Sequence, residues 1–363
     1  MPDTRLDAIK AWLKSDADPL GKHGLHVDRI VSASSDASFR RYFRVPCLSS
    51  TGSGSLIVMD APPPQEDCRP FVSVAHNFAV AGAAVPAILA QDIERGFLLL
   101  SDFGNQTFWA SVNGQSAATA NRFYSAALGD LVALQANFKS APPQSTASLA
   151  DSNLPDYDRK TLMRELMLYP QWYVAQHKKI TLTDAQNKVL MDAFELIISN
   201  NLAQPQVAVH RDYHSRNLMV LGTDSQSDST KLGMIDFQDA LIGPASYDVV
   251  SLLRDAYIEW EENDVLDWTI RYWEKARKAG IPLQEHFGDF YRDFEWMGLQ
   301  RHLKVLGIFA RLAHRDGKER YLADIPLVLK YALNEASRYR ALGPLAKLMQ
   351  TIEGATEQSG YTF

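Results

Sequence analysis

The sequence predicts an α+β protein with two unequal lobes, a small β-rich lobe followed by a larger helical one. Short runs with strand character alternate with turn residues before residue 100. After residue 105 apolar residues recur at helical spacing, and a second group of β-like runs interrupts this part between residues 206 and 237. We therefore expect a small N-terminal lobe over 1–100, a hinge over 101–105 and a larger C-terminal lobe over 106–363.

Composition is typical of a globular protein and excludes several functional classes. The 363 residues are 46% hydrophobic and 22% charged, and a formal net charge of −6 argues against a dedicated nucleic-acid binder. Two cysteines, Cys47 and Cys68, form neither a disulfide framework nor a CxxC metal pair. No secretory signal and no membrane-spanning apolar run is found, so we expect a cytoplasmic protein without a nucleic-acid or membrane partner.

In the first lobe, a short amphipathic helix near the N-terminus precedes a small sheet. A proline run after residue 61 ends one strand, because proline cannot donate to a strand ladder. A helix is expected to lie across the sheet. The expected strands cover 25–32, 41–45, 55–59 and 96–100, and the expected helix covers 71–81.

The second lobe is expected to be helical apart from one β-insert. Thr183 and Gln186 form a capping-box pattern that marks a helix start. The segment 140–156, rich in Pro, Ser and Ala, is typical of a loop. The expected helical regions are 121–138, 158–177, 183–201 and most of 245–347, and the expected β-runs are 206–210, 217–221 and 231–237.

The β-insert carries the residues that point to chemistry. Asp212 follows an apolar strand, Asn217 lies five residues later, and Asp236 ends a further apolar strand. Phosphoryl transfer needs a carboxylate that orients the attacking hydroxyl and accepts its proton, and it needs oxygen ligands for Mg²⁺. Asp212 fits the catalytic base, and Asn217 and Asp236 fit the metal ligands. Each residue alone is more typical of a turn or cap, so the prediction depends on their conjunction.

The same segment resembles a known family. His210, Arg211 and Asp212 with Asn217, followed by Asp236 between Ile and Phe, resemble the catalytic loop and metal-binding aspartate of kinases. The form of the segment is similar to the branch that contains aminoglycoside phosphotransferases and choline kinases. This resemblance implies a bilobal protein-kinase-like fold and an enzyme that uses ATP and Mg²⁺. It also implies that Asp248, with His210, supports the catalytic loop.

Three further stretches are similar to one group within that branch, at 39–44, 56–61 and 297–311. This group phosphorylates the anomeric hydroxyl of N-acetylmuramate and N-acetylglucosamine in bacterial cell-wall recycling, which implies a small sugar as the partner. Two alternatives stay open. One is an aminoglycoside, choline or ethanolamine kinase. The other is a non-catalytic ATP-binding scaffold, because the usual phosphate-binding strand lysine is missing and Met59 or a neighbour stands in its place.

By this resemblance, ATP binds between the small sheet and the hinge. The segment 32–38 occupies the phosphate-loop position without the usual glycines, and an arginine of the next strand is expected to replace the missing lysine. Arg40 is an alternative to the two arginines chosen. The residues predicted to bind ATP are Ser34, Ser35, Arg41, Arg44, Ser101, Asp102 and Phe103.

The acceptor site is expected on the helical lobe beside the base. The acidic stretch 255–295 suits a cationic acceptor, whereas the basic stretch 296–340 suits the lactyl carboxylate of N-acetylmuramate. His214 and Asp239 lie close to the predicted catalytic residues in the chain, and Arg301 lies on a helix of the basic stretch. These three residues are the acceptor candidates, and the oligomeric state is not specified by the sequence.

Overall fold

The computed structural model describes residues 3–18, 21–35, 39–49, 52–138, 154–224 and 229–354. It divides into two compact units, each described here by itself. Unit 1 comprises Met1–Ser111, Asn137–Leu154 and Arg216–Ala240, and unit 2 comprises Val112–Ala136, Pro155–Ser215 and Leu241–Phe363. This division differs from the expected one at 101–105, because the segment with Asn217 and Asp236 belongs to the N-terminal unit.

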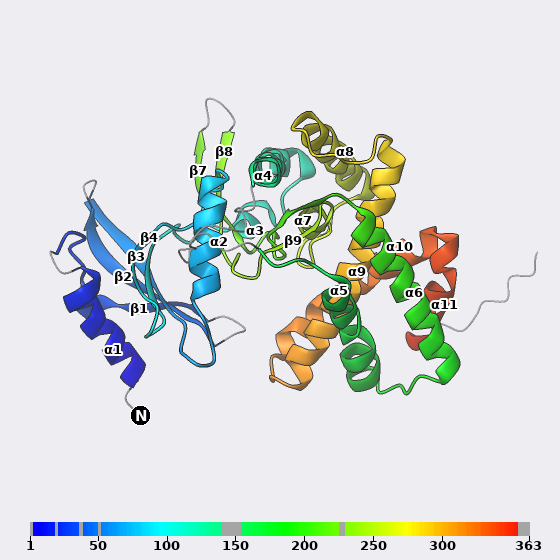
Figure 1. The fold of residues 1–363 in the computed structure, drawn as a ribbon, viewed down its shortest axis with the longest axis horizontal. Helices are drawn as coiled ribbons and strands as arrows, with labels where there is room; N and C mark the ends of the chain where they lie inside the picture. The colour runs from blue at the N-terminus through cyan, green and yellow to red at the C-terminus, as the bar shows by residue number, and fades with distance from the viewer. Residues whose placement is uncertain are drawn as a thin grey trace, which may run out of the picture. The chain divides into compact units, whose positions relative to one another are not determined.

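Unit 1 is built on a five-stranded antiparallel sheet in the order β1-β2-β3-β5-β4 (Figure 1). The three strands β2, β3 and β5 match expected runs. The strand β4 was not expected, because it is short and follows a proline. The strands are β1 (Val31–Ser35), β2 (Arg41–Ser49), β3 (Gly52–Asp60), β4 (Ile88–Asp92) and β5 (Phe97–Ser101).

The helix α1 (Thr4–Trp12) covers one face of this sheet. Phe43 and Val45 of β2 lie in the same buried cluster as Trp12 of α1, and the rings of Trp12 and Phe97 are 5.6 Å apart. Because side chains alternate along a strand, Arg41 lies on this face of β2 as well. The apolar face of the sheet is thus closed by the N-terminal helix.

A β-hairpin completes unit 1 and explains the observed division. The strands β7 (Leu218–Asp224) and β8 (Ser229–Met234) pair with each other. The Met234 N–H donates to the Ala84 carbonyl at 2.8 Å. Beyond β8, the Phe237 ring lies 4.7 Å from Phe71 of α2 (Arg69–Val80). The hairpin therefore packs with the N-terminal elements although it comes more than 100 residues later in the chain.

Unit 2 is mostly helical, with one two-stranded sheet, β6 (Gln206–Val209) and β9 (Leu241–Pro244). The predicted capping box is present, since the Thr183 side chain accepts the Gln186 N–H and the Gln186 side chain accepts the Thr183 N–H. A short helix α3 (Phe108–Val112) crosses the boundary between the units. The other helices are α4 (Ala117–Asn137), α5 (Arg159–Leu166), a π-helix (Tyr169–His177), α6 (Asp184–Ala203), α7 (Tyr247–Leu253), α8 (Glu262–Lys278), α9 (Phe287–His314), α10 (Ile325–Arg338) and α11 (Gly343–Ile352).

The helix α9 is the central element of unit 2. It is buried along most of its 28 residues, including polar positions such as Arg301 and Lys304. At Gly307 a Cβ atom would lie 2.4 Å from the Leu168 carbonyl carbon, so only glycine fits against the chain there. No helix among the described residues is both long and apolar enough to cross a membrane.

Candidate active site

The predicted catalytic loop leaves the buried strand β6 and is held at its start by Asp248. The Asp248 carboxylate, at the first turn of α7, accepts the N–H groups of His210 at 2.7 Å and Arg211 at 3.1 Å. Arg211 has a φ of +74°, a left-handed conformation that costs energy in a residue with a side chain. The two hydrogen bonds from Asp248 offset that cost and fix the direction of the chain toward Asp212.

Asp248 is fully buried, and burial raises the pKa of its carboxyl to about 7. The N–H groups of His210 and Arg211 act in the opposite direction, because they stabilise the charged form. The negative charge of Asp212 raises the pKa further. The role of this buried carboxyl is thus to accept the two backbone N–H groups that begin the catalytic loop.

Further contacts fix the rest of the loop within unit 2. The Asp212 N–H donates to Nδ1 of the buried His210 ring at 3.3 Å. The Tyr213 hydroxyl donates to the Ala127 carbonyl at 2.7 Å, and the Ser215 N–H donates to the Asp255 carboxylate at 3.0 Å. The sequence did not identify Asp255 as a loop support, because its partner lies 40 residues away.

Asp212 is partly exposed, and its surroundings favour the ionised form. Burial acts to raise the pKa of Asp212, but the positive charge of Lys304, followed by those of His214, Arg211 and Arg301, outweighs burial and holds the pKa below its usual value. An ionised, accessible carboxylate can accept a proton from a hydroxyl group. These are the properties that a general base needs.

A buried ionic cluster lies beside this loop, which we call the Glu165 cluster: Glu165 of α5, Lys304 of α9 and Arg211. The Lys304 Nζ lies 3.0 Å from Glu165 Oε1 and donates to the Tyr247 hydroxyl at 3.0 Å. Arg211 donates to the same carboxylate, and so does the Tyr157 hydroxyl. No local sequence signal marks Glu165, because its two charged partners, Arg211 and Lys304, come from 46 and 139 residues away.

In unit 1, the two predicted metal ligands lie next to each other. The Asn217 amide donates to Asp236 Oδ2 at 3.4 Å, and the Ile235 N–H donates to the Asn217 carbonyl at 3.0 Å. Gln238 donates from Nε2 to Asp236 Oδ1 at 2.8 Å. The hairpin β7–β8 brings the two residues together, since Asn217 precedes its first strand and Asp236 follows its second.

This donor set fits Mg²⁺ better than a transition metal. A carboxylate and an amide are hard oxygen donors, and Mg²⁺ completes its shell with phosphate oxygens and water. The described residues contain no group of three or more His, Cys, Asp and Glu that would hold a metal by itself. The buried Oε1 of Gln238 has no hydrogen-bond partner among the described atoms, so one further oxygen acceptor lies beside the two ligands.

The predicted hinge residues make specific contacts within unit 1. The Ser101 hydroxyl accepts the Ala87 N–H at 2.9 Å. Asp102 forms an ion pair with Arg44 at 2.5 Å and accepts the Ser55 hydroxyl at 2.6 Å. Burial raises the pKa of Asp102, but Arg44 and Ser55 outweigh it and hold the pKa below its usual value. The side chains of Arg44 and Asp102 are therefore engaged with each other.

Phe103 packs against the hairpin. A Cβ atom at Gly233 of β8 would lie 2.5 Å from the Phe103 ring, so the glycine leaves room for that ring. The Phe103 ring therefore lies against β8. Because the side chains of Asp102 and Phe103 are engaged in these contacts, the hinge backbone is the candidate contact for a nucleotide base.

Arg41 is a poor candidate for phosphate binding. Its guanidinium lies on the α1 face of the sheet and pairs with Asp60 at 2.6 Å and Asp3 at 2.5 Å. Arg40, just before β2, lies 3.8 Å from Glu66. Met59, which by the resemblance stands with its neighbours where the lysine is expected, is fully buried. Sequence reasoning chose Arg41 because period-two alternation alone does not show which face a helix covers.

For Ser34 and Ser35, which are also predicted to bind ATP, only the backbone belongs to the described part of the chain. Ser34 and Ser35 lie in β1, but their side chains lie outside the described residues, as does the segment 36–38.

The three acceptor candidates fall in different units. His214, in unit 2, is partly buried with its ring 5.5 Å from the Tyr257 ring. Arg301 lies on α9 of the same unit and is 4% exposed. Asp239 is exposed and belongs to unit 1. The structure therefore places two of the three candidates in the unit that carries Asp212.

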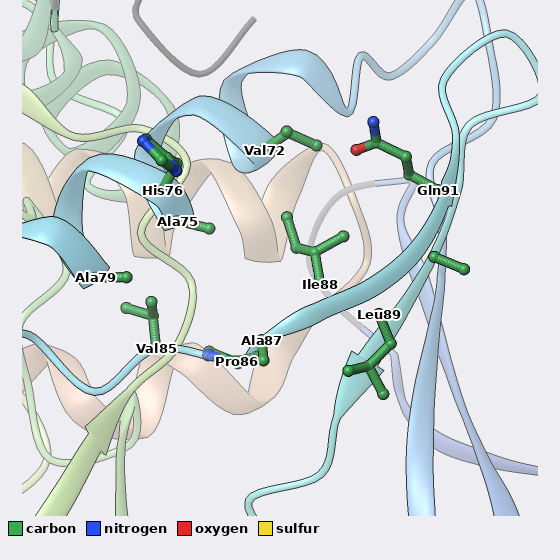
Figure 2. A pocket seen from close by; sticks show the side chains of 11 residues that line it. Val72, Ala75, His76, Ala79, Val85, Pro86, Ala87, Ile88, Leu89 and Gln91 are labelled. Atoms are coloured by element: carbon green, nitrogen blue, oxygen red, sulfur yellow. The ribbon is translucent and has the colours of Figure 1, made fainter. Parts of the chain in front are cut away.

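A separate cavity of about 540 Å³ lies in unit 1 between α2 and β4. Figure 2 shows Val72 and Ala75 of α2 on one side and Ile88 of β4 on the other. The lining is mainly apolar, and none of the predicted site residues contributes to it. This cavity is thus distinct from the residues that carry the predicted chemistry.

Comparison with known proteins bears on the whole chain. The model of the phosphotransferase enzyme family (APH) matches residues 29–281. An N-acetylmuramate/N-acetylglucosamine kinase of Neisseria meningitidis serogroup B is 45% identical over 91% of this chain and 93% of its own. A kinase with the same name from Pseudomonas aeruginosa is 44% identical over 98% of this chain and 99% of its own.

Solved structures show the same fold at low sequence identity. A microcompartment-associated aminopropanol kinase matches with a TM-score of 0.56 and 13% identity over 94% of this chain and 99% of its own. The ADP-bound aminoglycoside phosphotransferase APH(2'')-Ib matches with a TM-score of 0.54 and 14% identity over 91% and 98%. The protein-kinase-like fold that the sequence predicts is confirmed, and the chain belongs to the phosphotransferase enzyme family.

Proposed function

We propose that this enzyme transfers a phosphoryl group from ATP to the anomeric hydroxyl of N-acetylmuramate and N-acetylglucosamine. The observation that carries the proposal is the 42–45% identity to kinases named for these two sugars, over nearly the full length of both chains. Identity at this level does not depend on the catalytic motif alone, which aminoglycoside and choline kinases also contain. The substrate assignment therefore rests on the whole chain.

The chemistry of the acceptor hydroxyl is assigned to Asp212. Its carboxylate is ionised because the surrounding cations, Lys304 foremost, together outweigh the effect of burial on its pKa, and it is accessible to a ligand. In the proposed reaction Asp212 orients the 1-hydroxyl of the sugar by accepting its hydrogen bond and then takes its proton. Asp248 and His210 keep Asp212 in place through the backbone contacts described above.

The donor nucleotide is assigned to unit 1. Asn217 and Asp236 would hold Mg²⁺, which would stabilise the negative charge that develops on the transferred phosphoryl group. The backbone at Ser101, Asp102 and Phe103 would bind the adenine base. Only residues 213–216 separate Asp212 from Asn217, so the proposed base and one proposed metal ligand lie close together in the sequence.

The proposed role places the enzyme in peptidoglycan recycling in the cytoplasm, where ATP is available. The product would be a sugar 1-phosphate, a substrate for the nucleotidyl transfer that makes nucleotide sugars. The partner is thus a small sugar.

Phosphorus NMR of the enzyme with ATP and Mg²⁺ tests the proposal against four acceptors: N-acetylmuramate, N-acetylglucosamine, kanamycin and choline. We expect an anomeric sugar phosphate with the first two. Transfer to kanamycin or choline alone would contradict the substrate assignment. Retained ATP binding with no transfer to any acceptor would instead indicate a non-catalytic nucleotide-binding protein.

A further inference from the structure

Arg301 carries a buried positive charge that has no hydrogen-bonded partner in the part of the chain that the structure describes. Its side chain, on α9, is 4% exposed, and Nη1 is sealed from solvent without a hydrogen bond. Burying a guanidinium is unfavourable unless an anion or several acceptors replace its water shell. The arrangement is thus incomplete without a ligand.

The neighbouring basic residues on α9 do not share this property. Lys304, one turn further on, lies 3.0 Å from Glu165 and donates to the Tyr247 hydroxyl at 3.0 Å. His302 lies 2.8 Å from Glu335 through Nδ1. Arg301 therefore stands out among the basic side chains of this buried stretch.

Arg301 lies one turn before Lys304 on α9, and Lys304 contacts the same Glu165 carboxylate as Arg211, the residue before Asp212. The positive charge of Arg301 lowers the pKa of both Asp212 and Asp248, so the guanidinium lies within electrostatic reach of the proposed base. Asp248 directs its oxygens to the N–H groups of His210 and Arg211 instead of to Arg301. The field of the two carboxylates stabilises the guanidinium, but its hydrogen-bond donors stay available.

We propose that Arg301 binds the lactyl carboxylate of N-acetylmuramate and so sets the preference between the two amino sugars. The inference rests on the proposed function. The two sugars differ at O3, where N-acetylmuramate carries a lactyl ether with a carboxylate and N-acetylglucosamine carries a hydroxyl. The planar guanidinium fork matches the two oxygens of a carboxylate.

The test is the ratio of kcat/KM for N-acetylmuramate to that for N-acetylglucosamine. For Arg301→Met we expect this ratio to fall about 30-fold, as for the loss of a hydrogen-bonded charge pair. Arg301→Lys should retain part of the ratio, because it keeps the charge but loses the fork. Arg292→Met is the control, since Arg292 lies on the same helix with a 43% exposed side chain and should leave the ratio unchanged.

A second measurement uses the wild-type enzyme, in case Arg301→Met does not fold. Replacing N-acetylmuramate by its methyl ester removes the charge from the ligand, and we expect kcat/KM to fall about as much as in Arg301→Met. In Arg301→Met, by contrast, N-acetylmuramate and its methyl ester should have equal kcat/KM. An unchanged ratio in Arg301→Met, or an ester that reacts like the acid in wild type, would overturn the inference. Failure of the proposed function is distinct, because wild type would then phosphorylate neither sugar.

Discussion

Glu165 is the carboxylate shared by the buried Lys304 and the partly buried Arg211, and its replacement by glutamine tests the importance of the Glu165 cluster. The Glu165 side chain is 5% exposed, and that of Lys304 is 10% exposed. Burial acts to raise the pKa of Glu165, but Lys304 and Arg211 outweigh it, so the carboxyl is charged. Removing one partner of a buried ion pair costs about 3–5 kcal/mol, because the remaining charge is left without compensation.

We therefore expect Glu165→Gln to lower the free energy of unfolding by about 3–5 kcal/mol. Lys304→Met should lower it by less, about 1–3 kcal/mol, because Arg211 still neutralises Glu165. In the double variant Glu165→Gln/Lys304→Met one unpaired charge disappears, so the loss should be smaller than the sum of the single losses by about 2 kcal/mol.

The assay is urea unfolding followed by tryptophan fluorescence, with the four proteins in one double-mutant cycle. Glu195→Gln is the matched control, because Glu195 pairs with Arg159 at the surface and both side chains are 52% exposed. That control should lose less than about 1 kcal/mol. Additive losses in the cycle, or a loss at Glu165 no larger than at Glu195, would refute the reasoning.

Three other substitutions have expected outcomes. Asp212→Asn should lower kcat by about 10²- to 10⁴-fold, because the base contributes to the transfer step. The ATP affinity of this variant, measured by calorimetry, should stay within about twofold of wild type. An equal loss of ATP affinity would contradict this role. Asp248→Ala leaves the buried N–H groups of His210 and Arg211 without an acceptor, so urea unfolding should show a loss of about 2–5 kcal/mol. Burial raises the pKa of Asp130 to about 6, so the folded state holds this proton more tightly than the unfolded chain does and loses stability as the pH rises from about 4 to 6. Asp130→Asn should therefore stabilise the protein by about 1–2 kcal/mol at pH 7.5, a value reduced for partial exposure, and the gain should vanish below about pH 4 in thermal unfolding. A gain that persists at pH 4 would show that ionisation is not its cause.

The order of elements could be predicted from the sequence because local signals specify it. The capping box at Thr183 and the apolar run that leads to His210 depend on residues a few positions apart. The same holds for the spacing of Asn217 and Asp236, which the hairpin between them converts into neighbours in space. These signals need no knowledge of the tertiary fold.

Tertiary contacts decided the features that sequence reasoning missed. Arg41 and Arg40 are adjacent and chemically equal, and only the packing of α1 shows that Arg41 pairs with Asp60 on the face that this helix covers. Glu165 has the sequence context of an ordinary helix residue, and its role appears only when α9 brings Lys304 to it. The division into units also depends on contacts of the hairpin with Ala84 and Phe71.

Gly307 sets the register of α9 along its own axis. Each residue of a helix advances it by about 1.5 Å, so a slip of one position would bring Leu306 or Ile308 against the Leu168 backbone, where even a Cβ atom has no room. Lys304 and Arg301 lie one and two turns before this contact, and their distances to the catalytic loop follow from it. The absence of a side chain at residue 307 thus helps to determine where the charges of Lys304 and Arg301 lie relative to the proposed base.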